Sequence, residues 1–245
     1  LVIFLIGLII TRIIDKLIGH TLKKAKAGPT ATGFGHSLVR VVLYSVLIVI
    51  FLSVLGVPMA SIVAIVGAAG VTIGLALQNS LSNLAGGFVL LFAKPFMAGD
   101  YIIVGEKEGY VEQVTIYYTK LLTRDNQKIY LPNSIVSSGA VVNLSQKRSL
   151  RLIVPLTIAY GSDLEMVRQA LMTALKMQKI VKSVPEPCIA VSELADSGIR
   201  LSIIVWVDSD DYFIAAGPIL ESAVSTLKDI NVAIPYPQLD VHNIK

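Results

Sequence analysis

The sequence is short of the residue types that most catalytic and metal sites need. Its 245 residues contain one cysteine, Cys188, and three histidines, His20, His36 and His242. A single cysteine excludes an intramolecular disulfide and any multi-cysteine metal site. None of the histidines accompanies Cys188 in a pattern typical of a nucleophile with its base. The sequence therefore predicts no catalytic residue, no metal site and no cofactor.

Charge is also missing from a long stretch of the chain. From Val41 to Ala93 there is no Asp, Glu, Lys, Arg or His. Such a run must be embedded in lipid or fully buried in protein. The chain as a whole is 54% hydrophobic, which is too apolar for an ordinary soluble protein. The composition indicates a chain that is partly membrane-embedded and partly soluble.

The excess of basic over acidic residues lies entirely on the membrane side of the chain. Of the net charge of +4, residues 1–40 carry +5 and residues 94–245 carry −1. A nucleic-acid-binding domain needs a basic face on its soluble part, and the soluble part here is nearly neutral. The charge distribution therefore argues against a nucleic-acid partner.

The apolar pattern predicts a membrane domain over residues 1–93, with spans at about 1–22, 35–55 and 61–78. Gly28 and Pro29 end the first helix, and Gly56 to Pro58 form the turn between the other two. The loop after the first span contains three lysines, Lys23, Lys24 and Lys26. By the positive-inside rule this loop is cytoplasmic, which places the N-terminus outside and the C-terminal domains in the cytoplasm.

The third apolar segment is longer than a bilayer requires, because it runs from about residue 61 to residue 92. Its middle is polar, from Gln78 to Asn83, and Gly86 and Gly87 add a weak point. We expect a kink near Asn79, followed by an interfacial helix over 81–92. Asn79, Gly86 and Gly87 are the predicted hinge residues.

Arg12 lies near the end of the first predicted span and admits two interpretations. With Lys16 one turn later, its long side chain can extend to the membrane interface. Alternatively, Arg12 senses voltage or lipid.

Small residues flank a narrow stripe on the third segment. On a helix with roughly 100° per residue, Val71 and Leu75 lie on one stripe. Gly67, Gly70 and Gly74 lie on one side of it, and Ala68, Thr72 and Asn79 lie on the other. The predicted packing residues are the three glycines, Ala68, Thr72 and Ala76. Small residues allow membrane helices to approach closely, and two different flanks favour head-to-tail contacts that close into a ring. Val71 and Leu75 would then form an apolar constriction on the ring axis. Tight packing inside an ordinary membrane bundle is the alternative.

The rest of the chain is predicted to be soluble and of mixed structure. Residues 94–145 contain short β-branched and aromatic runs, which are typical of a small, strongly bent β-sheet. Residues 146–236 alternate strand and helix patterns, which indicates an α+β domain. Residues 237–245 form a short extended tail that several copies could close into a barrel.

Residues 67–87, GAAGVTIGLALQNSLSNLAGG, followed by FAKPFMAGDYI at 92–102, carry a family resemblance. This text is similar to the pore helix and the start of the next domain in the MscS family of bacterial small-conductance mechanosensitive channels. The similarity continues through Gly109-Tyr110-Val111, Thr123, Leu131-Pro132-Asn133 and Pro235-Tyr236-Pro237, so it covers essentially the whole chain.

The resemblance implies a ring-shaped homo-oligomer, usually a heptamer, in the cell inner membrane. Each subunit would have three transmembrane helices, a cytoplasmic Sm-like β domain and an α+β domain, with a terminal β-barrel shared by the ring. The implied function is a channel that membrane tension opens, releasing ions and small osmolytes on hypoosmotic shock. Membrane lipids are its other partners. A non-conducting, membrane-anchored scaffold with a cytoplasmic ring is the alternative.

The resemblance also implies roles for particular residues. Phe34 in the first cytoplasmic loop, with Leu77 and Leu81, would carry force between the lipid-facing helices and the pore. Two positions depart from the family pattern, since Asn79 and Val71 stand where the family usually has glycine and leucine. The asparagine changes the ease of bending, and the shorter valine narrows a pore less than leucine.

Overall fold

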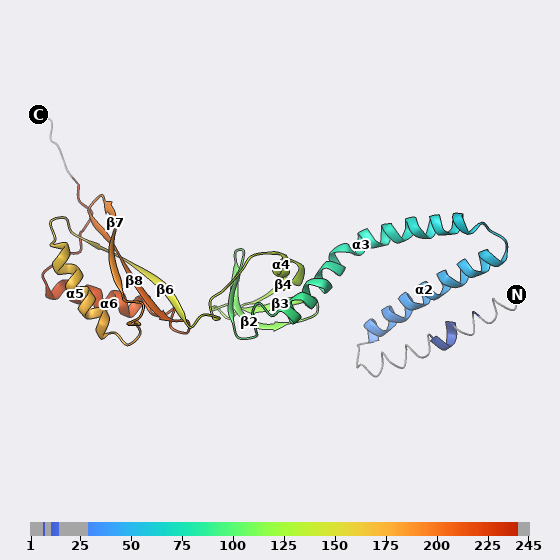
Figure 1. Cartoon of the computed structure of the whole chain (residues 1–245), viewed down its shortest axis with the longest axis horizontal. Helices are drawn as coiled ribbons and strands as arrows, with labels where there is room; N and C mark the ends of the chain where they lie inside the picture. Colours follow the sequence, from blue (N-terminus) through green and yellow to red (C-terminus); the bar gives the residue numbers. More distant parts are fainter. Residues whose placement is uncertain (1–6, 8–10, 15–28, 240–245) are drawn as a thin grey trace, which may run out of the picture. The chain divides into compact units, whose positions relative to one another are not determined.

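A computed structural model describes Gly7, residues 11–14 and residues 29–239. The chain divides into two compact units, and the boundary lies between Asn79 and Ser80. The first unit contains the apolar helical residues up to Asn79, and the second contains the residues from Ser80 on, including both sheets. Figure 1 colours the chain from blue at the N-terminus to red at the C-terminus. The predicted first span, 1–22, lies almost entirely outside the described residues.

Helix α2 (Pro29–Val54) begins earlier than the predicted start at residue 35. Pro29 occupies the first helical position, where its fixed φ suits the helix and its missing N–H has no intrahelical partner to lose. Gly33 and Gly35 follow within the helix without ending it. Phe34 therefore lies within α2, and its predicted place in a loop was wrong.

The end of α2 is set by Gly56. This glycine has φ of +84°. Its N–H donates to Ser53 O at 3.2 Å, and the Val57 N–H donates to Leu52 O at 3.1 Å. A left-handed residue with these two bonds satisfies the last carbonyls of the helix, and glycine adopts that conformation without a Cβ penalty. Pro58 follows, so the chain turns where the sequence predicted.

Helix α3 (Met59–Ala93) is one continuous element where two segments, 61–78 and 81–92, were predicted. Within the described residues, Gly33–Val54 and Met59–Ala93 are long and apolar enough to cross a bilayer. The predicted bend near Asn79 stays a prediction, although the boundary between the two compact units falls at that residue. Helix α3 ends where Lys94 adopts φ of +46° and Pro95 prevents continuation.

The second unit begins with a β domain formed by one antiparallel sheet in the order β4-β3-β2-β1-β5. Its elements are β1 (Tyr101–Val104), β2 (Lys107–Val114), β3 (Tyr118–Leu122), β4 (Lys128–Pro132), α4 (Asn133–Ser138) and β5 (Val141–Asn143). Ile102 and Leu121 are fully buried in its core, together with Val136 of α4 and Leu90 of α3. Helix α3 therefore contributes to the core of this domain.

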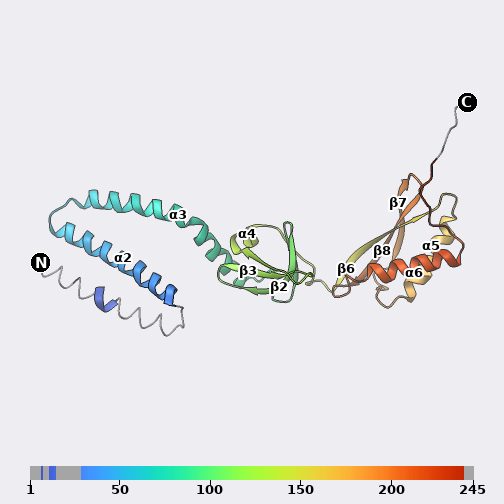
Figure 2. The same cartoon turned by 180° about the vertical axis from the view of Figure 1, so that it is seen from behind.

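An α+β domain follows, with a three-stranded antiparallel sheet in the order β6-β8-β7. Its elements are β6 (Ser149–Ile158), α5 (Leu164–Met177), β7 (Cys188–Ala195), β8 (Gly198–Asp208) and α6 (Ala216–Asp229). Alternate residues of β8, such as Leu201 and Ile203, are buried with α5 and α6 residues in a core that lies on one face of the sheet; Figure 2 shows both helices beside it. Cys188 is exposed at the start of β7.

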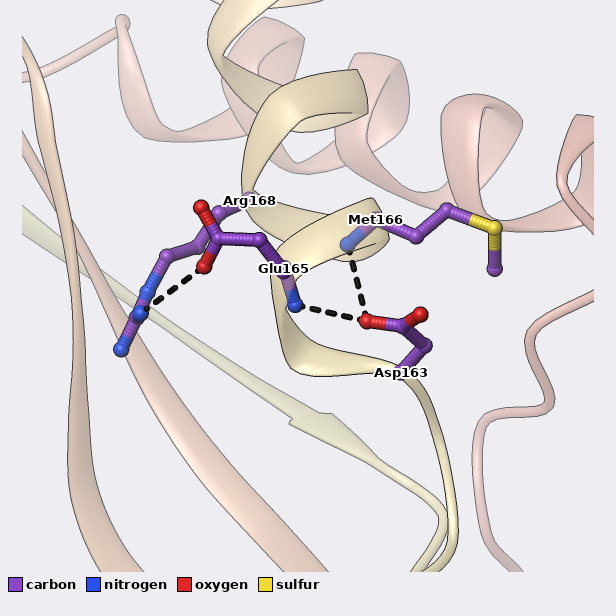
Figure 3. A network of polar contacts seen from close by, with 4 residues as sticks. All are labelled: Asp163, Glu165, Met166 and Arg168. Carbon is purple, nitrogen blue, oxygen red and sulfur yellow. Dashed lines mark hydrogen bonds and ion pairs between the residues drawn. The ribbon is translucent and has the colours of Figure 1, made fainter.

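The N-terminus of α5 is capped by Asp163, as Figure 3 shows. Its Oδ1 accepts from the N–H groups of Glu165 at 3.0 Å and Met166 at 3.1 Å. The preceding residue, Ser162, donates its hydroxyl to Ala159 O instead of capping the helix. A carboxylate accepts two helix N–H groups and complements the positive end of the helix dipole, which favours Asp163.

The segment after α6 returns to the sheet. The Ala159 N–H donates to Ala233 O at 3.0 Å, and the Gln238 N–H donates to Ser197 Oγ at 3.0 Å. Residues 237–239 form no strand within the chain. The remainder of the predicted barrel strand, 240–245, lies outside the described residues.

Candidate pore helix

The first part of α3 is almost uncovered by its own chain. Every residue from 63 to 82 is exposed. The side chains of Val71 and Leu75 are 65% and 67% exposed. A Cβ placed on Gly67, Gly70 or Gly74 would meet no atom within 4 Å. The predicted constriction and its glycine flank are therefore open to contacts from outside the chain.

On the opposite flank, the Thr72 hydroxyl needs no hydrogen-bond partner from a neighbouring helix. The Thr72 Oγ1 donates to Ala68 O one turn earlier, at 2.9 Å. Because this bond satisfies the hydroxyl within the helix, the flank presents methyl groups and small apolar surfaces. Ala68, Thr72 and Ala76 are all exposed. Both flanks of the stripe are thus smooth.

The last part of α3 is docked on the β domain. Asn83 is 6% exposed, and its Oδ1 accepts from Ser134 N at 3.0 Å and from Ser134 Oγ at 2.9 Å. Ser134 lies in the first turn of α4, where backbone N–H groups have no intrahelical acceptor. Asn83 therefore satisfies a terminal group of α4 from a different helix. We call Asn83, Gly86, Gly87 and Leu90 the docking face of α3.

The two glycines of the docking face allow close approach of the β domain. A Cβ on Gly86 would lie 2.7 Å from Asn133 O, and a Cβ on Gly87 would lie 2.4 Å from Ile116 O. These separations are shorter than any ordinary contact, so a side chain at either position would force the backbones apart. The contact explains both glycines without a hinge, and their predicted hinge role stays a prediction.

Asn133 supports the docking face from within the β domain. It is fully buried, its Oδ1 accepts from Thr119 Oγ1 at 2.9 Å, and its Nδ2 donates to Thr115 O at 2.9 Å. These bonds connect α4 to β3 and to the turn before it. A buried, satisfied network of this kind rigidifies the surface on which α3 rests.

The sequence analysis missed the role of Asn83 and Asn133. Asn83 was grouped with the polar residues that weaken the middle of the helix. A signal was present, because Asn83, Gly86 and Gly87 are three and four residues apart and share one helix face. A polar residue beside two glycines on one face indicates close contact with another backbone.

The remaining predicted residues lie on exposed surfaces. Phe34, Leu77 and Leu81 are 71%, 55% and 65% exposed, so none of them is buried within the chain. Arg12 is exposed in the short described segment and lines a hollow of about 160 Å³ that Arg40 also lines. Force transfer and sensing stay predictions for these residues.

One tyrosine of the β domain has a shifted pKa. Burial, reinforced by the neighbouring Glu108 carboxylate, raises the pKa of Tyr101 to about 12. Its neutral phenol is therefore the form that the fold favours. At the surface of the same domain, the Glu112 carboxylate 2.9 Å away raises the pKa of Lys128.

Comparison with known proteins identifies the family. Family models described as mechanosensitive ion channel transmembrane helices 2/3, mechanosensitive ion channel beta-domain, and mechanosensitive ion channel MscS C-terminal match residues 37–78, 79–146 and 152–224. The chain belongs to the MscS family of mechanosensitive ion channels. The junction between the first two matches, at residues 78 and 79, lies one residue before the unit boundary between Asn79 and Ser80.

Individual relatives agree over the whole chain. An uncharacterised MscS family protein of Synechocystis is 35% identical over 245 residues, which cover 100% of this chain and 83% of the relative. The small-conductance mechanosensitive channel of Edwardsiella ictaluri is 33% identical over 98% of this chain and 84% of its own length. The crystal structure of Helicobacter pylori MscS in the closed state superposes with a TM-score of 0.91 at 25% identity, covering 100% of this chain and 96% of that one.

These matches confirm the resemblance inferred from residues 67–102. The MscS family is a family of membrane channels and not of enzymes, so a mechanosensitive channel is the supported function and the scaffold alternative is not favoured. The membrane helices and the β domain agree with the predicted fold class.

Proposed function

We propose that copies of this chain form a tension-gated pore whose closed constriction is made by Val71 and Leu75. The copies surround a central axis as a homo-oligomer, which the family resemblance makes a heptamer. The open pore releases ions and small osmolytes from the cell on hypoosmotic shock.

The observation that carries this proposal is the uncovered first part of α3. Residues 63–82 are exposed on every side, yet Gln78, Asn79, Ser80 and Ser82 lie among them. Polar side chains facing hydrocarbon are costly and favour the inside of a bundle or a water-filled cavity. Small residues on both flanks favour helix neighbours rather than lipid. Neighbouring copies on the flanks and water on the axis satisfy both requirements.

The gating step follows from two properties of this helix. Val71 and Leu75 present only hydrocarbon, so a narrow ring of them excludes water and ions without a plug. The two smooth flanks let neighbouring helices slide without breaking hydrogen bonds. If the open ring occupies more membrane area than the closed ring, tension shifts the population toward the open state.

The membrane topology is part of the same proposal. Three spans place the N-terminus outside, the lysine-rich loop inside and the soluble domains in the cytoplasm of a cell whose inner membrane holds the channel. Lys94, directly after α3, supports a cytoplasmic exit. The residues 237–245 of all copies close the far end as a β-barrel.

Force reaches the pore through exposed apolar residues. Phe34 on α2 and Leu77 and Leu81 on α3 are available for contacts between copies, because none is buried in its own chain. Bending at Asn79, with Gly86 and Gly87 downstream, would let the uncovered part of α3 tilt while the docking face stays on the β domain. Arg12 holds the first span at the lipid interface.

Purified protein in liposomes tests the function directly. Patches under suction should show unitary currents whose open probability rises with tension, and bi-ionic reversal potentials in the same patch give ion preference. Gly74→Leu, which adds a large side chain to the sliding surface, should raise the pressure needed for opening. Silent patches that contain correctly inserted protein would refute the channel proposal.

A further inference from the structure

The β domain and the α+β domain are joined by a short linker, residues 144–148, between β5 and β6. Its first residue is tied to the β domain, because the Leu144 N–H donates to Tyr101 O at 2.9 Å. Ser145 Oγ accepts from Tyr101 N at 2.8 Å. Its last residue is tied to the other domain, because the Ser209 N–H donates to Arg148 O at 3.3 Å. The linker is therefore anchored at both ends.

Phe213 provides a second connection between these two domains. It lies in the segment between β8 and α6, and its ring centroid is 4.7 Å from that of Tyr101 on β1. The Arg124 guanidinium carbon, from the turn between β3 and β4, lies 4.4 Å from the same ring. An aromatic ring held between another ring and a guanidinium makes two favourable contacts at once.

Both sides of this contact are held in place. Tyr101 is 2% exposed and packs edge-to-face with Tyr110, with centroids 4.9 Å apart. On the other side, Tyr212 packs against the core of the α+β domain and against the Phe213 ring at 5.3 Å. The contact between Phe213 and Tyr101 therefore joins the packed surface of the β domain to the packed surface of the α+β domain.

A single linker leaves two domains free to rotate about it, and small interfaces between domains ordinarily permit such motion. A second attachment away from the linker removes most of this freedom. Each contact of Phe213 favours the docked arrangement by roughly three- to tenfold, as aromatic and cation–π pairs do. The acidic segment around Phe213, with Asp208, Asp210 and Asp211, is also opposite in charge to Arg124.

We propose that Phe213 locks the α+β domain to the β domain at a fixed angle through Tyr101 and Arg124. Because the β domain rests on the docking face of α3, the lock makes the two soluble domains of one chain move with that face as a single body. The inference concerns the soluble domains and holds independently of whether the assembly conducts.

Distance measurements by pulsed electron paramagnetic resonance test the lock in the full-length assembly. One spin label is placed on Cys188 and the other on a cysteine introduced by Gln127→Cys, since both positions are exposed. Labelled chains are diluted with Cys188→Ser chains so that most assemblies hold one labelled copy. Phe213→Ala should at least double the width of the distance distribution.

Ile214→Ala is the matched control, because Ile214 is the next residue in the same segment and is 61% exposed. It should leave the distribution unchanged. Equal widths for the Phe213 and Ile214 variants would overturn the proposal.

Arg124→Gln provides a second variant, since it alters an exposed residue and leaves both cores intact. It should broaden the distribution less than Phe213→Ala does, and an unchanged width would also overturn the lock. Currents from the same samples are recorded separately, so silent patches with a broadened Phe213 variant would refute the channel and support the lock.

Discussion

The two parts of α3 are similar in sequence and opposite in surroundings. Both are uncharged and both contain glycines. A Cβ on Gly70 would meet nothing within 4 Å, whereas a Cβ on Gly87 would lie 2.4 Å from Ile116 O. In the uncovered part, glycine leaves room for a neighbour that is not in the chain. In the docked part, the space beside the glycine is already occupied by the backbone of the β domain.

The polar residues of α3 repeat this difference. Gln78 is exposed, and Asn83 is buried with two hydrogen bonds to Ser134. The Gln78 amide is accessible to water or to another copy, whereas the Asn83 amide stabilises the fold of its own chain. A small or polar residue in an apolar helix therefore indicates a contact with another backbone. Whether that contact is mobile or fixed depends on the surface that packs against it. Four predictions test this difference.

The largest effect is expected from Gly87→Val. The valine side chain would collide with the backbone of Ile116, in the turn before β3. It should therefore destabilise the docking of α3 on the β domain by about 3 kcal/mol. Hydrogen exchange of the α4 and β3 amides in purified protein measures this loss. Gly70→Val is the control, and its exchange in these elements should equal that of the unmodified protein. Equal exchange in both variants would contradict the docking face.

Alkaline pH should weaken the β domain through Tyr101, whereas α3 itself holds no ionisable group. The pKa of Tyr101 is raised to about 12, so its neutral form contributes stability that is complete below the ordinary pKa of about 10. As pH rises from 10 to 12, the unfolding free energy should fall by a few kcal/mol at most, on the order of 1 kcal/mol for each pH unit. Chemical denaturation across this range measures the fall. Tyr101→Phe should flatten the profile, and an identical profile would refute the assignment.

Removing the Asn83 side-chain amide comes next. Asn83→Ala leaves the partly buried Ser134 N–H and hydroxyl without this acceptor and should cost about 2 kcal/mol. Thermal unfolding of the second unit, followed by the fluorescence of Trp206, measures the loss. Gln78→Ala on the uncovered part should shift the transition by less than about 0.5 kcal/mol. A larger shift from Gln78→Ala than from Asn83→Ala would reverse the comparison.

The smallest effect per chain is expected at the constriction. Val71→Ser lowers the cost of wetting the closed pore by about 1 kcal/mol per chain, so less pressure should open it. Pressure-clamp recording measures the midpoint. Ile73→Ser is the control, because Ile73 lies roughly 200° around the helix from Val71. If both variants leave the midpoint unchanged, Val71 does not line the constriction.

Local patterns predicted much of this molecule. The chain turn at Gly56 and Pro58, the β-sheet after the membrane helices and the α+β character of the following domain were predicted from residues close in sequence. The largest local error was the start of α2, where Pro29 begins the helix instead of extending the loop before it. Proline is compatible with both places, and only the residues that follow distinguish them.

The sequence by itself determined the uncharged membrane segment, the two smooth flanks beside Val71 and Leu75, and the family. The first two depend on residue type and helical spacing, and the family was inferred from the resemblance carried by residues 67–102; none of them needs knowledge of distant contacts. Only the tertiary structure decided that Gly86 and Gly87 receive the β domain, that Asn83 caps α4 and that Phe213 reaches Tyr101. Each of these contacts joins residues far apart in the chain. The spacing of residues along one helix or strand does not indicate which distant surface packs against it.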